Sequence, residues 1–286
     1  ESLKNARAVN DALLNQSKTY SSINELQREV VKNEKYQMQV SRQYGMSYEI
    51  LGQSLYPPSH PYNWPVIGYV DDLYRASLKD LKNFFLRWYG PNNAILTIAG
   101  DVNSETVIPL VEKYFGSIPR GSEVRKLSPM VPRLSSDMYT GYTDNVYLPM
   151  TDIVFPTVPN YHRDEAALDI LASLMGDGKN SIFYKNFIKS EKAIQASVSH
   201  PCRELSGEFH FTVLTFPDWQ EDQGVYFNNI EADIRNSIAD WEEKGFSEED
   251  LEMVKTKIIS QNYDMITSIS SKATLISRWE WLARGR

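Results

Sequence analysis

The segment from residue 88 to residue 121 most constrains the fold of this chain, because it alternates helix and strand signals without filler. Gly90-Pro91-Asn92-Asn93 is turn chemistry. Ala94 to Ala99 is an apolar run of strand length, and Ser104 predicts the start of a helix that follows it. A helix end, a buried strand and a second helix in such close order predict helices packed against a sheet, which is an α+β organisation.

Composition limits the classes of protein that remain. The 286 residues suffice for one or two domains with a sizeable core, and the net charge of -7 argues against a nucleic-acid partner. No apolar run approaches the roughly 20 residues of a membrane span. Cys202 is the single cysteine, which excludes an internal disulfide and a cysteine-based zinc site.

Proline and glycine between residues 117 and 136 predict a linker at 121–136. We therefore expect one domain over residues 1–120 and a second over 137–286. Both ends of the sequence fall inside helical patterns, so each domain is expected to be incomplete. The predicted helices span residues 2–16, 22–42, 44–55, 77–88, 104–116, 164–175, 219–244 and 247 onward, and the predicted strands span 94–99, 138–142, 151–155, 193–201 and 208–216.

Glu34 is a carboxylate that the helical pattern aims near an apolar face. Ile23, Leu26, Val30 and Met38 form the predicted buried stripe of their helix. At about 100° per residue, Glu34 lies within about 40° of Ile23 and Val30. Spacing alone leaves three readings open: the side chain reaches solvent, pairs with Arg28 or a lysine, or ligates a metal.

The other motifs are incomplete. His162 and Glu165 form half of an H-x-x-E-H zinc motif, but Ala166 occupies the closing position. His60 is expected to be a structural residue of a proline-rich loop, and His200 and His210 are expected on strands as core or surface residues. The glycine loop at 176–180 lacks the spacing of a phosphate-binding loop. The residues alone predict a two-domain α+β protein without a complete active site.

Four segments in combination resemble the insulinase/pitrilysin family of zinc peptidases, whose metal motif is H-x-x-E-H. They are Gln27 to Lys35 (QREVVKNEK), His60 to Gly68 (HPYNWPVIG), Tyr89 to Asp101 (YGPNN followed by IAGD) and Tyr114 to Pro119 (YFGSIP). Their order and spacing fit the family throughout, and no single segment is specific by itself.

The resemblance implies a zinc endopeptidase that cleaves peptides or unfolded proteins. In this family two histidines of H-x-x-E-H and a later glutamate bind Zn²⁺, and the glutamate within the motif is the general base. The later glutamate follows an R-x-x-V-x-x-E pattern, which assigns Glu34 as a zinc ligand. The H-x-x-E-H segment would lie upstream of Glu1, so this chain is expected to lack two ligands and the base and to be inactive alone. Gln27 departs from the glutamate that many members carry there.

The resemblance also implies the architecture and the partners. Each family domain has a mostly antiparallel sheet backed by helices, and four domains enclose the substrate. Gly176 and Gly178 would belong to a glycine-rich turn near the substrate entrance. The partners would be a peptide or unfolded substrate and either the remaining domains or a partner subunit, in a periplasmic or secreted setting. The alternative is a non-catalytic relative that acts as a scaffold or substrate-binding subunit.

Overall fold

The computed structural model describes residues 17–218 and 220–283. It divides into two units, each described here by itself: one contains the residues up to Leu81 together with Leu134–Val146, and the other contains Lys82–Arg133 together with the residues from Tyr147 onward. The predicted linker, residues 121–136, contains neither helix nor strand. The division into domains at 1–120 and 137–286 stays a prediction, and the helix expected over residues 2–16 lies outside the described residues.

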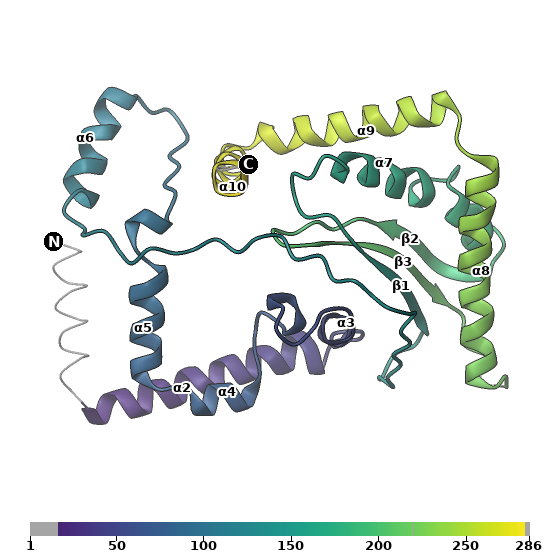
Figure 1. Ribbon diagram of the computed structural model, residues 1–286, viewed down its shortest axis with the longest axis horizontal. Coiled ribbons are helices and arrows are strands. Elements are labelled where there is room, and N and C mark those ends of the chain that lie inside the picture. The colour runs from purple at the N-terminus through teal and green to yellow at the C-terminus, as the bar shows by residue number, and fades with distance from the viewer. Residues whose placement is uncertain (1–16, 219, 284–286) are drawn as a thin grey trace. The chain divides into compact units, whose positions relative to one another are not determined.

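The first unit is helical (Figure 1). Helix α2 (Ser17–Lys35) passes directly into a π-helical turn (Tyr36–Val40), and α3 (Ser47–Leu55) and α4 (Val70–Arg75) follow. A wider π-helical turn within a helix often marks a functional position. The strand predicted at residues 138–142 is absent from the described part of this unit.

Helix α5 (Leu78–Trp88) begins where the sequence predicts, at Ser77 and Asp80: the Asp80 backbone N–H donates to Ser77 Oγ, and the Ser77 backbone N–H donates to Asp80 Oδ2. The spacing of Leu78, Leu81, Phe84, Phe85 and Trp88 in the sequence predicts a core stripe on α5, and this prediction is wrong for the described chain. Leu81, Phe84 and Phe85 are exposed, because no described element packs over them. Residues 94–99 likewise pair with no described strand, so the apolar run forms no β-ladder there.

The turn between α5 and α6 (Ser104–Phe115) is held by Asn92. Its Oδ1 accepts from the Gly121 backbone N–H at 2.7 Å, and its Nδ2 donates to the Ser122 carbonyl at 3.1 Å. A Cβ atom added to Gly90 would lie 2.7 Å from Gly121 Cα, which no real side chain tolerates. The turn and the segment after α6 are therefore clasped together, and the glycine is required by that close approach.

The second unit contains an antiparallel sheet in the order β1-β3-β2. Strands β1 (Met150–Thr157), β2 (Ala193–Ser199) and β3 (Gly207–Thr215) confirm three of the predicted strands. Phe211 in the central strand lies opposite Ile153 of β1 and Val198 of β2. Together with the helices, this small antiparallel sheet confirms the predicted α+β class.

Helices cover one face of this sheet (Figure 1). Phe209, Phe211 and Val213 alternate toward a core shared with α7 (Glu165–Gly176), a π-helical turn (Tyr184–Ile188) and α8 (Gln223–Lys244). The period-two alternation in the sequence of β3 therefore predicts the buried face correctly.

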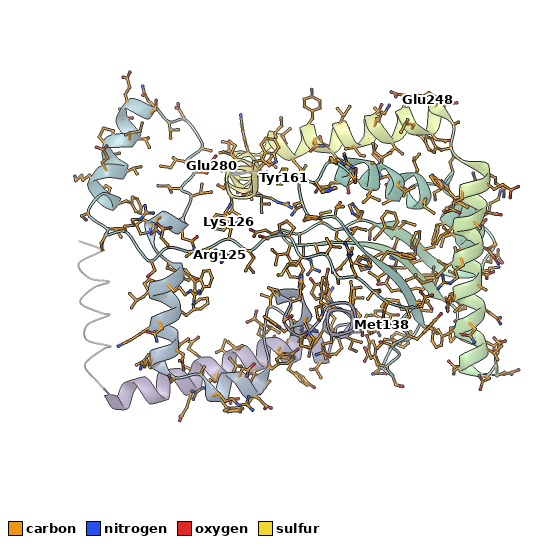
Figure 2. The ribbon with its side chains drawn as sticks, in the orientation of Figure 1. Arg125, Lys126, Met138, Tyr161, Glu248 and Glu280 are labelled. Carbon is orange, nitrogen blue, oxygen red and sulfur yellow. The ribbon has the colours of Figure 1, made fainter. Side chains whose placement is uncertain are left out.

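The C-terminal helical pattern divides in two. Ser247 and Asp250 form a capping box at the start of α9 (Glu248–Thr267), where the sequence predicts that a helix begins. Extended backbone at Ser268 then separates α9 from α10 (Ile269–Ala283), where a single helix was predicted. Lys126, from the predicted linker, lies beside α10 (Figure 2) and donates from Nζ to the Trp281 carbonyl at 2.6 Å. Among the described helices, none has the length and apolar character that crossing a membrane requires.

Candidate functional site

Helix α2 presents a basic face that is fixed to its own unit. Arg28 donates from Nε to the Leu73 carbonyl at 2.8 Å and from Nη2 to the Ala76 carbonyl at 2.9 Å. These carbonyls belong to the end of α4, where helical partners are lacking. Lys32 lies over the ring of Tyr74, with 5.5 Å between Nζ and the ring centroid. Spacings of four and three residues put Arg28, Lys32 and Lys35 on one side of the helix.

The apolar stripe of α2 is open instead of buried. Leu26, Val30 and Met38 keep 62%, 49% and 58% of their surface exposed, so the prediction that they are buried is wrong for the described chain. The physical reason is that α3 and α4 engage the basic face and no described element covers the apolar one.

Glu34 lies exposed along this open stripe. Pairing with Arg28 is excluded as its role, since that guanidinium is occupied by backbone carbonyls. Glu34 itself forms no hydrogen bond or ion pair with any residue that the structure describes. A solvated carboxylate and a metal ligand remain as its readings.

The number and arrangement of histidine, cysteine and acidic side chains determine whether the described residues could bind zinc. Within residues 17–218 and 220–283, no group of three or more histidine, cysteine or acidic side chains is arranged to hold a metal. Protein zinc sites use three or four such ligands. Glu34 therefore fits the role of one carboxylate ligand, and the described residues do not form a zinc site by themselves.

The two glycines of the loop after α7, Gly176 and Gly178, meet different structural requirements. A Cβ atom on Gly176 would lie 2.6 Å from the Val198 backbone nitrogen, so this glycine permits close packing of α7 on β2. Gly178 adopts a φ of 73° and has open space around it. Their predicted role in substrate binding is not tested by this geometry and stays a prediction.

A hollow of about 220 Å³ lies beside this loop and is lined in part by Asp177 and Asn180. Its apolar wall includes Trp241 and Phe246, whose rings stack with centroids 5.9 Å apart. Asp177 forms an ion pair with Lys257 at 2.7 Å and is thereby already neutralised. The glycine loop therefore lies next to a hollow, but the residues that line it identify no ligand.

The first two histidines in the sequence, His60 and His162, each accept a hydrogen bond from a nearby backbone N–H. His60 is buried between Tyr56 and Tyr62, and its Nδ1 accepts from the Tyr62 backbone N–H at 3.0 Å. His162 is exposed, and its Nδ1 accepts from the Asp164 backbone N–H at 3.2 Å. Glu165 accepts from the Tyr161 backbone N–H instead of facing a metal.

His200 connects three elements of the second unit. Its side chain is 1% exposed, with Nδ1 2.7 Å from Asp169 Oδ1 and Nε2 2.9 Å from Thr157 Oγ1. Cys202 Sγ lies 3.5 Å from Nε2 and donates to the Val158 carbonyl. Burial, followed by the charges of Glu165 and Asp169, raises the pKa of the Cys202 thiol to about 12. Such a thiol is no nucleophile at neutral pH, so this cluster holds α7, β1 and the end of β2 together.

His210 forms a second acidic network on the opposite face of the sheet. Its Nδ1 lies 3.0 Å from Asp152 Oδ2, and its Nε2 lies 3.1 Å from Glu208 Oε2. Burial alone would lower the pKa of His210, but hydrogen bonds to these two carboxylates raise it to about 9. Glu208 also pairs with Arg203. Sequence reasoning missed both histidine networks, because each includes an aspartate from a distant segment, Asp169 beside His200 and Asp152 beside His210, which no local motif connects to the histidine.

Comparison with known proteins identifies the family. Residues 75–258, more than half of the chain, match the family described as "Peptidase M16 inactive domain". The chain belongs to the peptidase M16 family. This confirms the zinc peptidase relationship predicted from the four sequence segments.

The relatives of this M16 chain include enzymes and subunits. The zinc protease PqqE of Helicobacter pylori is 31% identical over 177 residues, which are 61% of this chain and 40% of that protein. The mitochondrial-processing peptidase subunit beta of Caenorhabditis elegans is 24% identical over 59% of this chain and 36% of that protein. The chain thus spans less than half the length of these relatives.

Solved structures agree on the fold. A protease from Helicobacter pylori superimposes with a TM-score of 0.78 and 25% identity, over 91% of this chain and 62% of that one. A peptidase M16 inactive domain from Pseudomonas fluorescens gives a TM-score of 0.67 at 14% identity, over 89% and 60% of the two chains. The second similarity concerns the fold alone.

Proposed function

We propose that this chain is part of a zinc-dependent metalloendopeptidase that cleaves peptides or unfolded proteins. The observation that carries the proposal is Glu34, a carboxylate without a partner among the described residues, on the open apolar stripe of a helix whose other face is fixed. The chain belongs to a family with relatives named zinc proteases, which supports the same conclusion.

Within such an enzyme, the residues of this chain would hold and orient the site without completing it. Glu34 would supply one carboxylate ligand, and Arg28 and Lys35 would fix the rotation of α2 so that this carboxylate points away from α3 and α4. A bound zinc ion would supply Lewis acidity and an activated water. The histidine ligands and the general base would come from elsewhere in the polypeptide or from a partner subunit, so the chain alone would be inactive.

The loop containing Gly176 and Gly178 would contribute to substrate binding beside its hollow. Because a peptidase of this kind acts on extended chains, its substrates would be peptides or unfolded segments. A periplasmic or secreted location is part of the proposal, supported by the fold shared with a periplasmic protease of Escherichia coli.

A non-catalytic role is the second candidate. The family description that matches residues 75–258 is that of an inactive domain, and one relative is named as a subunit of a larger peptidase. In this case the chain would belong to a scaffold or a substrate-binding subunit, and Glu34 would be a solvated surface residue.

Zinc content separates the two candidates. The full-length protein that carries this chain is purified as wild type, as Glu34→Gln and as Glu29→Gln, and bound zinc is measured by atomic emission. We expect one zinc per active site in the wild type and in the Glu29→Gln control, with loss of zinc and of peptide cleavage in Glu34→Gln. Full zinc occupancy in Glu34→Gln would refute the ligand role, and absence of zinc from the wild type would favour the scaffold.

A further inference from the structure

An inward-facing ion pair follows Glu34 directly. Lys35 Nζ lies 3.1 Å from Glu49 Oε2, and the two side chains are only 14% and 9% exposed. The neighbouring pair on the same helix, Lys32 with Glu29, is 30% and 57% exposed. An exposed pair contributes little to structure, whereas an ion pair withdrawn from water depends on both partners.

Lys35 joins three segments of the first unit. In addition to Glu49 of α3, its Nζ donates to the Gly68 carbonyl at 2.9 Å, in the loop before α4. The same ammonium lies over the ring of Tyr69, with 5.2 Å to the centroid. The ammonium therefore has three contacts within the first unit, and together they hold the Lys35 side chain in one orientation.

This fixation determines where Glu34 points. Consecutive residues of an α-helix project about 100° apart, so a helix that directs Lys35 toward α3 directs Glu34 away from it. Lys35 is also the last residue of α2 before the π-helical turn, where the helical path changes. Without the pair, the Lys35 ammonium would keep its contacts with the Gly68 carbonyl and the Tyr69 ring but would lose the anion that draws this last turn toward α3.

We propose that Lys35 and Glu49 are positioning residues that hold the carboxylate of Glu34 in the direction required of a metal ligand. The proposal rests on the ligand role proposed for Glu34. Supporting residues around a metal ligand commonly change metal affinity by about 10–100-fold when they are removed. Because Glu49 acts through the helix and does not contact the Glu34 carboxylate, we expect the lower end of this range.

The test measures zinc affinity in the full-length protein by competition with a chelator. Glu49→Gln keeps the size of the side chain but removes the charge opposite Lys35, and Glu29→Gln is the matched control at the exposed pair. We expect zinc to bind about tenfold more weakly in Glu49→Gln and unchanged in Glu29→Gln. Cobalt replaces zinc in a parallel measurement, and we expect a shifted visible absorption spectrum in Glu49→Gln, which a loss of stability alone would not produce.

The Glu34→Gln variant separates failure of the proposed function from failure of the positioning role. If it retains zinc, the proposed function fails. If it loses zinc while Glu49→Gln binds zinc like the wild type, with an unchanged cobalt spectrum, the positioning role is overturned. Equal weakening in Glu29→Gln would also overturn it. Should Glu49→Gln fail to fold, Glu49→Asp keeps the charge and withdraws the carboxylate by one methylene; weaker zinc binding supports the role, and wild-type affinity refutes it.

Discussion

Gly176→Ala tests whether the glycine loop is shaped by packing. The added methyl group would lie 2.6 Å from the Val198 backbone nitrogen and 2.9 Å from Val198 Cβ, so either α7 or β2 must move. Overpacking of this kind costs about 1–3 kcal/mol, while replacing a helical glycine by alanine returns up to about 1 kcal/mol. Because the obstructing atoms belong to Val198, whose backbone is held in the β2–β3 ladder, we expect a net loss of about 1–2 kcal/mol.

Urea unfolding followed by circular dichroism measures this loss as a lower transition midpoint at an unchanged slope. Gly141→Ala is the matched control, because nothing lies within 4 Å of its added Cβ and its φ is not in the left-handed region. We expect the control to stay within about 0.5 kcal/mol of the wild type. A Gly176→Ala variant as stable as the control would refute the packing argument and leave substrate binding as the reason for this glycine.

Two further predictions concern the sheet. The pKa of His210 is raised to about 9, above its unfolded value, so its protonated form stabilises the fold below about pH 6.5 and this contribution is lost as pH rises through about 9. His210→Gln should remove up to about 3 kcal/mol of this pH-dependent term, and a wild-type stability that stays flat between pH 6.5 and 9.5 would contradict it. Cys202, with a pKa of about 12, should react slowly with a thiol reagent at pH 8 until the protein is unfolded in urea. Rapid labelling of the folded protein would show that this thiol is accessible and ionised.

Local signals in the sequence predicted the structural features that depend only on residues close together in the chain. The alternation of Phe209, Phe211 and Val213 predicted the buried face of β3, and the helix starts predicted at Ser77 and Ser247 coincide with observed caps. These features depend on residues within one or two turns of each other, so one sequence suffices to find them.

Features that depend on distant partners could not be predicted. Leu26, Val30 and Phe84 have the spacing of buried residues, yet burial requires a second surface that the described chain does not provide. One carboxylate beside each of His200 and His210 comes from a distant segment, Asp169 at 31 residues and Asp152 at 58, and no periodicity connects these pairs. For Glu34 the helical pattern placed the carboxylate on the apolar stripe, and the ligand role came from the family resemblance alone.

The clasp made by Asn92 bears on how relatives of this chain are recognised. The residues Tyr89-Gly90-Pro91-Asn92-Asn93 belong to one of the four segments that resemble the family, and the role of Asn92 there is structural: its amide bridges two backbone groups of the chain beyond the next helix. Such a hydrogen-bonded bridge would stabilise the fold of a non-catalytic scaffold and of a hydrolase equally well. A motif search built on these five residues therefore collects shared architecture, and sorting enzymes from inert relatives requires reading the ligand positions themselves.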